Sequence, residues 1–307
     1  MVWQFRPSMA LVAALAVAVV ISGTQPQVAA QGKQLRDSFN TYYYCGWQPQ
    51  YTWLEDNGYT INLKLDNWSG SGFQSSNSYT KGFISTSIKL VPGNSAGVVV
   101  AYYMSSPRDN TTTDWDEIDF EFLGNVTGQP WILQTNIFTN GTGGREQRIF
   151  LWFDPTADYH TYSILWNEHQ ILWYVDSMPI RVYRNTTITS ATYPTYRPMT
   201  IYSSIWNGDS WATRGGLDKI DWTQAPFIAS YSGFYVDACT WNKPGPAPSC
   251  FYDSSSSWWD QADKWTMTDA EKSAYTNITS NYMIYNYCTD YQRYPVQMPD
   301  CAVPPWE

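Results

Sequence analysis

The 307-residue chain is poor in histidine, in charge and in clustered basic residues. It has only two histidines, His160 and His169, which disfavours a serine hydrolase that depends on a Ser-His-Asp triad. Charged residues make up 15% of the chain, and no Lys/Arg cluster is interleaved with aromatic residues. We therefore expect no nucleic-acid partner. Without a calcium-type Asp-rich loop, we expect neither a metal nor another cofactor.

Long apolar runs are also missing, apart from one near the N-terminus. Residues 9–21 are apolar, follow Arg6 and precede the small residues Val28-Ala29-Ala30. Because a membrane helix needs about 20 apolar residues, this run predicts a secretory signal over residues 1–30 rather than a span. An uncleaved anchor is the alternative. The mature chain would start near Gln31, outside the cytosol and without membrane association.

Cysteine is scarce and unevenly placed. Four of the five cysteines fall in the last quarter of the chain, Cys239, Cys250, Cys288 and Cys301, and the fifth is Cys45. In an oxidising compartment the four would form two disulfides, whose pairing the spacing leaves open. Export also agrees with six Asn-X-Ser/Thr sequons, at Asn67, Asn110, Asn125, Asn140, Asn185 and Asn277.

Aromatic residues are abundant at 17%, with 17 Trp and 24 Tyr. They suit a β-rich core, and they also suit stacking on sugar rings. From residue 59 onwards, short alternating runs are separated by turn residues such as Ser69–Gly72 and Pro92-Gly93. Such spacing predicts an antiparallel β-sandwich. The Trp-rich stretch 202–216 is either a long surface loop or a sugar-contacting segment, and we favour the second.

The chain after Cys239 differs in composition. We expect a catalytic domain over residues 31–237 and an extension over 238–307 that packs on it and is held by the disulfides. Thr268-Asp269-Ala270-Glu271 predicts the start of a helix, and residues 282–288 predict one more strand.

One segment, Asp116-Glu117-Ile118-Asp119-Phe120-Glu121-Phe122, alternates acidic and apolar residues. On a strand the acids share one face and the apolar side chains share the other. Four residues span about 13 Å, and two Glu side chains leaning together could bring their carboxyl groups to roughly 6 Å. This is close to the spacing of a retaining glycosidase pair. Like charges would split the three pKa values and leave one group protonated. A solvated acidic face and a cation site are the alternatives.

The same segment, extended to Asn125, resembles the active-site strand of plant xyloglucan endotransglucosylase/hydrolases of glycoside hydrolase family sixteen. Further stretches resemble the family between residues 39 and 301, among them Val91-Pro92-Gly93-Asn94-Ser95-Ala96-Gly97, Arg145-Glu146-Gln147-Arg148, Trp211-Ala212-Thr213-Arg214-Gly215-Gly216 and Tyr285-Asn286-Tyr287-Cys288-Thr289-Asp290.

The resemblance implies a concanavalin-like β-jelly-roll with a concave cleft. It implies retaining cleavage of the β-1,4-glucan backbone of xyloglucan, with transfer to another xyloglucan end or to water. Glu117 would be the nucleophile, Glu121 the acid/base, and Asp119 the support of the nucleophile. The residues expected to contact sugar are Gln134, Asn136, Glu146, Arg148, Trp206, Trp211, Ala212, Gly216 and Arg293. The resemblance also implies a glycan on Asn125 and the pairs Cys239–Cys250 and Cys288–Cys301. We expect a monomer in the plant cell wall.

The chain departs from the family pattern at three places. Trp115 stands where the family usually has His, Gly144 where an Asp is common, and Cys45 lies in a divergent stretch. Trp115 and Gly144 lie beside the predicted site, so they affect substrate detail and rate rather than the reaction class. The alternatives are a related glucanase acting on mixed-linkage or other β-glucans, and a lectin-like wall binder without turnover.

Overall fold

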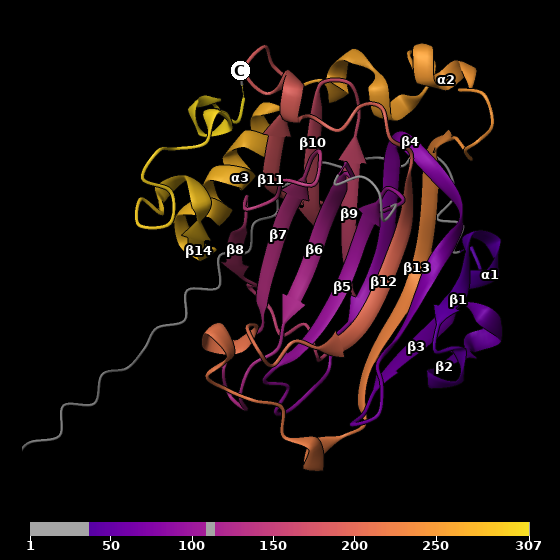
Figure 1. The fold of residues 1–307 in the computed structure, drawn as a ribbon, viewed down its shortest axis with the longest axis vertical. Helices are drawn as coiled ribbons and strands as arrows, with labels where there is room; N and C mark the ends of the chain where they lie inside the picture. Colours follow the sequence, from indigo (N-terminus) through magenta and orange to yellow (C-terminus); the bar gives the residue numbers. More distant parts are fainter. Residues whose placement is uncertain (1–36, 109–113, 307) are drawn as a thin grey trace, which may run out of the picture. The chain divides into compact units, whose positions relative to one another are not determined.

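Antiparallel strands form most of the computed structural model, which describes residues 37–108 and 114–306 (Figure 1). The all-β fold predicted from the sequence is confirmed. The strands of the described residues are β1 (Tyr43–Trp47), β2 (Thr52–Glu55), β3 (Thr60–Leu65), β4 (Ser71–Lys89), β5 (Val98–Ser105), β6 (Glu117–Leu123), β7 (Ile132–Phe138), β8 (Gln147–Phe150), β9 (His160–Trp166), β10 (Gln170–Val175), β11 (Met178–Arg184), β12 (Met199–Asn207), β13 (Phe227–Thr240) and β14 (Met283–Asn286). The α-helices are α1 (Phe39–Tyr42), α2 (Ser249–Tyr252) and α3 (Asp269–Tyr282).

The long strand β4 belongs to both layers of the sandwich. Its first half pairs with β1 and β12, and its second half pairs with β13 and β9. One layer therefore runs β1-β4-β12-β5-β6-β7-β8-β14, and the other runs β2-β3-β13-β4-β9-β10-β11. The strand passes between layers near Lys81 and Gly82, which both have positive φ. A Cβ atom at Gly82 would lie 2.2 Å from Ala238 Cβ, so the crossing requires glycine.

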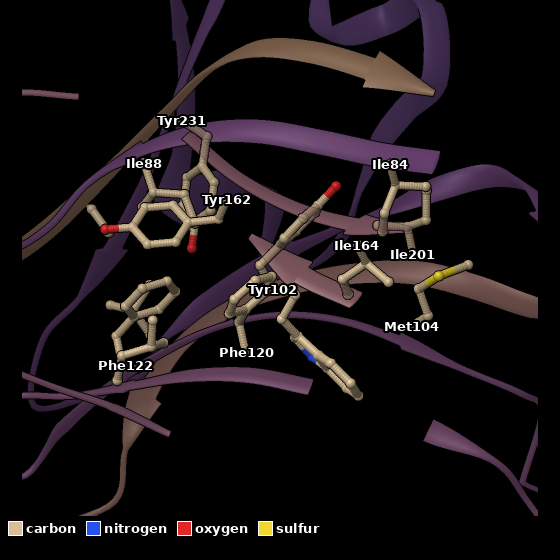
Figure 2. Packing of buried hydrophobic residues seen from close by; sticks show 14 of the residues in the cluster. Ile84, Ile88, Tyr102, Met104, Phe120, Phe122, Tyr162, Ile164, Ile201 and Tyr231 are labelled. Carbon is tan, nitrogen blue, oxygen red and sulfur yellow. The ribbon is translucent and has the colours of Figure 1, made fainter. Parts of the chain in front are cut away.

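The core lies between the two layers (Figure 2). Phe120 and Phe122 of β6 pack edge-on against Tyr162 of β9, with ring centroids 5.8 and 4.7 Å apart. Phe73 of β4 packs in the same way against Tyr231 of β13. All five side chains are buried. The aromatic excess of the sequence therefore builds much of this core.

One boundary predicted from the sequence is wrong. The Ser69–Gly72 loop is shorter than predicted, because β4 already begins at Ser71, where it pairs with Ile205 of β12. The first six residues of the Trp-rich stretch 202–216 belong to β12, which ends at Asn207, so this stretch is not one long surface loop. Gly and Ser have a low propensity for strands. Ser71 and Gly72 nevertheless pair with Ile205 and Ser204 of β12, and the hydrogen bonds of this pairing outweigh the low propensity.

The C-terminal segment packs on β8 and β11. Helix α3 begins where the sequence predicted a helix start. A capping box forms there, in which the Thr268 side chain accepts from Glu271 N and Glu271 Oε2 accepts from Thr268 N. Strand β14 follows and pairs with β8. Disulfides join Cys239 to Cys250 and Cys288 to Cys301, and Cys45 is a free thiol that accepts a hydrogen bond from Thr52 Oγ1. The described residues, 37–108 and 114–306, belong to one compact unit, and β13 continues past residue 237.

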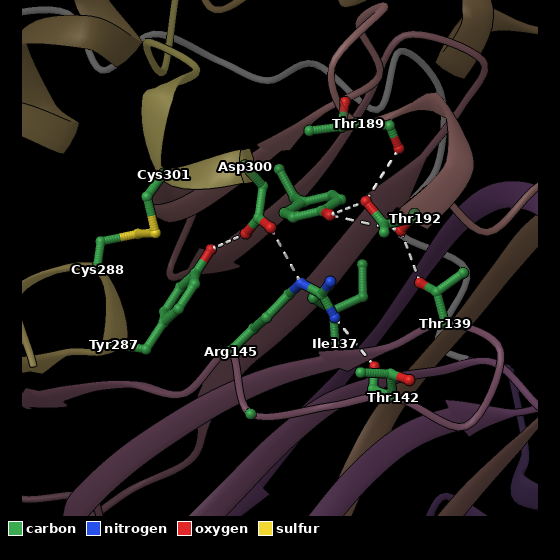
Figure 3. A network of polar contacts seen from close by, with 12 residues as sticks. Ile137, Thr139, Thr142, Arg145, Thr189, Thr192, Tyr287, Cys288, Asp300 and Cys301 are labelled. Carbon is green, nitrogen blue, oxygen red and sulfur yellow. Dashed lines mark hydrogen bonds and ion pairs between the residues drawn. A yellow bond between two sulfur atoms is a disulfide. The ribbon is translucent and has the colours of Figure 1, made fainter. Parts of the chain in front are cut away.

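A buried polar network joins the segment to the sheet (Figure 3). Asp300 Oδ1 accepts from Arg145 Nε at 3.4 Å, and Asp300 Oδ2 accepts from the Tyr287 hydroxyl. The Arg145 and Asp300 side chains are 5% and 3% exposed. Because neither charged group is solvated by water, the attraction between the two charges has to offset the free-energy cost of burying them.

Replacing Asp300 with Ala is expected to lower the free energy of unfolding by about 3 kcal/mol, because it leaves the buried Arg145 guanidinium without its counter-charge. Guanidinium unfolding at equilibrium would measure the loss. Asp263→Ala is the matched control, since the Lys264–Asp263 pair is exposed and should contribute less than about 1 kcal/mol. Equal losses in the two variants would show that the buried network does not hold the segment.

Candidate active site

A cleft of about 400 Å³ opens on the outer face of the layer that contains β6. Strands β5, β6, β7 and β12 supply most of its walls. The residues that line it are Ala101, Tyr103, Arg108, Glu117, Asp119, Glu121, Gln134, Asn136, Phe138, Glu146, Ser204, Trp206 and Trp211. The cleft therefore brings together the three acids and five of the nine sugar-contacting residues expected from the sequence.

The alternation of β6 places its acids. Ile118, Phe120 and Phe122 are fully buried in the core, so Glu117, Asp119 and Glu121 point to the opposite face and into the cleft. On the neighbouring strand β7, Phe138, Asn136 and Gln134 stand directly opposite Glu117, Asp119 and Glu121. The strand pairing therefore fixes which side chain each acid meets.

Glu121 is held by a chain of hydrogen bonds. Gln134 Nε2 donates to Glu121 Oε2 at 2.6 Å, and Arg148 Nε donates to Gln134 Oε1 at 2.7 Å. Arg148 does not line the cleft, but it orients the amide that does. Burial raises the pKa of Glu121, the Gln134 hydrogen bond opposes this rise, and the charge of Glu117 adds to it. A raised pKa suits a group that must carry a proton.

Asp119 lies between the two glutamates and is fully buried. Burial, followed by the like charges of Glu117 and Glu121, raises the pKa of Asp119 well above its usual value. Burial also raises the pKa of Glu117, whereas the positive charge of Arg108 and a hydrogen bond with Asp119 lower it. The arrangement therefore favours a proton on Asp119 and a negative charge on Glu117. A charged Glu117 and a Glu121 of raised pKa are together the combination that a nucleophile and a general acid require.

Sequence reasoning missed Arg108, Tyr103, Phe138, Ala101 and Ser204. Arg108 Nη2 lies 2.8 Å from Glu117 Oε2 and forms an ion pair with it. The other four are strand residues that face the cleft through their pairing with β6 or with its neighbours. Only the strand order, which the sequence does not reveal, could have identified them.

Strand pairing also shows which residues share the face of the layer on which the cleft opens. Two rows of directly paired residues cross the layer from β1 to β7: Tyr44, Gln74, Tyr202, Tyr103, Asp119 and Asn136, and Trp47, Gly72, Ser204, Ala101, Glu121 and Gln134. The Tyr103 and Tyr202 rings stack with centroids 5.3 Å apart. Tyr44 and Trp47 are 47% and 42% exposed on β1. In the second row, the residues between Trp47 and Glu121 are all small: Gly72, Ser204 and Ala101.

Trp206 and Trp211 form one wall, with ring centroids 6.0 Å apart. Ala212 lies behind them, buried against Val99 and Leu123. Gly216 also supports the wall from outside the cleft, because its φ is +86° and a Cβ atom there would lie 2.2 Å from Ser210 O.

The remaining expected residues lie near one end of the cleft or outside it. Glu146 lines the cleft and accepts hydrogen bonds from both Arg293 Nη atoms, at 2.8 and 3.2 Å. Arg293 therefore acts on the cleft by holding the Glu146 side chain. Asn125 is half-buried just after β6, and its Nδ2 donates to Pro130 O. The sequon at Asn110 lies outside the described residues, as does the predicted signal at residues 1–30.

The histidines lie away from the cleft. His160 Nδ1 is 2.6 Å from Asp176 Oδ2 and the ring stacks on Phe153, while His169 stacks on Trp265. Residues 37–108 and 114–306 contain no group of three or more His, Cys, Asp or Glu side chains arranged to hold a metal ion. Within the same ranges, no helix has the length and apolar character needed to span a membrane.

Family models match two parts of the chain. Glycosyl hydrolases family 16 matches residues 39–224, and the xyloglucan endo-transglycosylase C-terminus matches residues 253–301. The first match includes the cleft-lining strands, and the second covers α3, β14 and the second disulfide.

Several named proteins are similar over most of their length. A probable xyloglucan endotransglucosylase/hydrolase protein 8 of Arabidopsis thaliana is 48% identical over 280 residues, covering 91% of this chain and 90% of its own. A xyloglucan endotransglucosylase protein 2 of Diospyros kaki is 48% identical, covering 94% of both chains. Among solved structures, a Bacillus licheniformis β-glucanase aligns with a TM-score of 0.51 and 25% identity, covering 62% of this chain and 89% of its own.

Proposed function

Because the chain belongs to glycosyl hydrolase family 16, we propose that its cleft performs retaining cleavage of the β-1,4-glucan backbone of xyloglucan and transfers the fragment to another xyloglucan end or to water. The acids of β6 support this proposal most directly, because all three line the cleft and burial raises the pKa of each, with that of Asp119 well above its usual value. The names of the similar proteins support the substrate.

In the first step, a Glu117 oxygen attacks the anomeric carbon of the sugar, and the bond from that carbon to the glycosidic oxygen breaks. Glu121 gives its proton to the departing oxygen. The products are an ester between Glu117 and the donor fragment, and a released chain with a new hydroxyl group. Gln134 and Arg148 hold Glu121 toward the leaving oxygen.

In the second step, Glu121 takes the proton of an incoming hydroxyl group. The hydroxyl oxygen bonds to the anomeric carbon and the ester breaks, which restores the Glu117 carboxylate with overall retention. A sugar hydroxyl gives transfer and water gives hydrolysis. Asp119, protonated between the two, donates a hydrogen bond to Glu117 and limits the charge gathered on the strand.

Incubating the protein with xyloglucan and labelled xyloglucan oligosaccharides tests the proposal. We expect the label to enter long chains without a matching rise in reducing ends. An increase in reducing ends without incorporation of the label would show that the protein hydrolyses xyloglucan instead of transferring it. A parallel series with mixed-linkage β-glucan tests the alternative substrate, which the likeness to a bacterial β-glucanase favours.

The rows that reach β1 predict a dependence on donor length. Adjacent strands are about 4.8 Å apart, so Trp47 lies about 19 Å from Glu121 across the layer. This distance is several sugar units. Trp47→Ala should lower kcat/KM about tenfold for long donors and leave short donors unchanged, because only long donors reach that ring. Trp53→Ala is the matched control, since Trp53 is 38% exposed on β2 in the other layer. An equal loss for short donors would contradict the extended cleft.

We also propose that the mature protein acts outside the cell as a monomer in the cell wall. The N-terminal apolar run, the sequons and the two disulfides support this location. We expect the Asn125 sequon to carry a glycan. Mass spectrometry of the exported protein would determine both the first residue and the occupied sequons.

A further inference from the structure

We propose that Arg108, held against the Trp115 ring, is a positioning residue that fixes the Glu117 carboxylate for attack. The inference rests on the proposed function, and it concerns one of the places where the chain departs from its family's pattern. Arg108 belongs to the segment that follows β5, and Trp115 to the segment that precedes β6. The two residues therefore flank the entry into the acidic strand.

Three side chains form a stack beside Glu117. The Arg108 guanidinium carbon lies 3.6 Å from the centroid of the Trp115 ring. Phe138 also stacks on Trp115, with ring centroids 4.6 Å apart and an angle of 27° between the planes. Phe138 stands directly opposite Glu117 on β7. The contact with Trp115 limits where the guanidinium can lie, and its Nη2 atom meets Glu117 Oε2 at 2.8 Å.

The segment that carries Trp115 is itself anchored. Trp115 O accepts from Gly141 N, and Asp116 Oδ1 accepts from Arg197 Nη1 at 3.0 Å and from Asn140 N at 3.0 Å. Because the tryptophan cannot move freely, it provides a fixed platform for an arginine whose side chain is 56% exposed. An exposed ion pair without such a platform would contribute little.

The groups around Glu117 make the Arg108 contact important for keeping the Glu117 carboxyl group ionised. Asp119 and Glu121 face it from its own strand, and Tyr103 and Ser105 face it from β5. On β7 its opposite residue is the uncharged Phe138. Among the described residues that contact Glu117, Arg108 is the one cation. Losing it would leave a buried carboxylate among like charges, which favours the protonated form that cannot attack.

A functional test compares Arg108→Gln, Arg108→Lys, Trp115→His and the Arg108→Gln/Trp115→His double variant. For Arg108→Gln we expect about a tenfold loss of kcat/KM and an acid limb displaced to higher pH, because a charge-assisted hydrogen bond is removed. Arg108→Lys keeps the charge and should restore the acid limb but not the full rate. Trp115→His should lower kcat/KM and displace the acid limb about as much as Arg108→Gln does. The double variant should lose no more kcat/KM than Arg108→Gln alone. Lys272→Gln removes a distant exposed charge on α3 and should change neither quantity.

A second readout does not depend on turnover. Titration of 13C-labelled glutamate by NMR should show that the Glu117 carboxyl group holds its proton to higher pH in Arg108→Gln than in the wild type. An unchanged titration of Glu117, or a loss of rate that is additive with Trp115→His, would overturn the inference. A wild-type protein that transfers and hydrolyses nothing, yet shows the titration shift, would refute the proposed function and keep the Arg108 contact.

Discussion

Replacing Glu117 with Gln is expected to lower kcat on xyloglucan by about 10⁴-fold or more, because an amide cannot form the glycosyl ester. The change keeps the size of the side chain, so KM and the unfolding midpoint should stay close to the wild type. Initial rates of transfer to a labelled oligosaccharide would measure the loss.

The control for this prediction is Glu55→Gln. Glu55 lies at the end of β2, in the other layer, and accepts a hydrogen bond from Trp53 Nε1. It should leave the rate unchanged. Turnover of Glu117→Gln within tenfold of the wild type would exclude Glu117 as the nucleophile.

Replacing Glu121 with Ala is expected to have the second-largest effect, and its size should depend on the leaving group. With xyloglucan the rate should fall about 10³-fold, because the departing sugar oxygen needs a proton. With an activated aryl glycoside, whose phenolate leaves without a proton, release of the phenol in the first turnover should fall less than tenfold. A stopped-flow burst of the phenol measures this step separately from the second.

The pH profile gives an independent check on Glu121. Since burial raises the pKa of Glu121, the wild type should keep its protonated acid into the weakly acidic range, and activity should fall as pH rises through that pKa. The basic limb should therefore disappear in Glu121→Ala with the activated donor. An equal loss for both leaving groups, or an unchanged basic limb, would assign the proton to another group.

The sequence predicted those features that depend on local periodicity. The alternation from Glu117 to Phe122 identified β6, its buried face and its acidic face, and the structure places both as predicted. The N-cap residue Thr268 and the acidic residues that follow it likewise identified the start of α3. In each case the residues that determine the structure lie within a few positions of one another in the chain. The local sequence pattern is therefore enough to predict the structure.

Features that depend on strand order could not be predicted in this way. The row that joins Trp47 to Glu121 crosses three other strands, β4, β12 and β5, and nothing in the order of the chain places β12 between β4 and β5. Arg108 was missed for a similar reason, because its meeting with Glu117 depends on how the chain returns from β5 to β6. The resemblance named Arg148 and Arg293, but only the structure shows that both act through neighbours.

The most direct test of the account is to identify the residue that becomes covalently attached to the sugar. The wild-type protein would be incubated with a xyloglucan oligosaccharyl donor that carries fluorine at C2 of the reacting sugar, which slows release of the ester. Peptide mass spectrometry would then locate the added mass. The account predicts attachment to Glu117. Attachment to Glu121 or to any other residue, or an unmodified protein that still turns over xyloglucan, would contradict it.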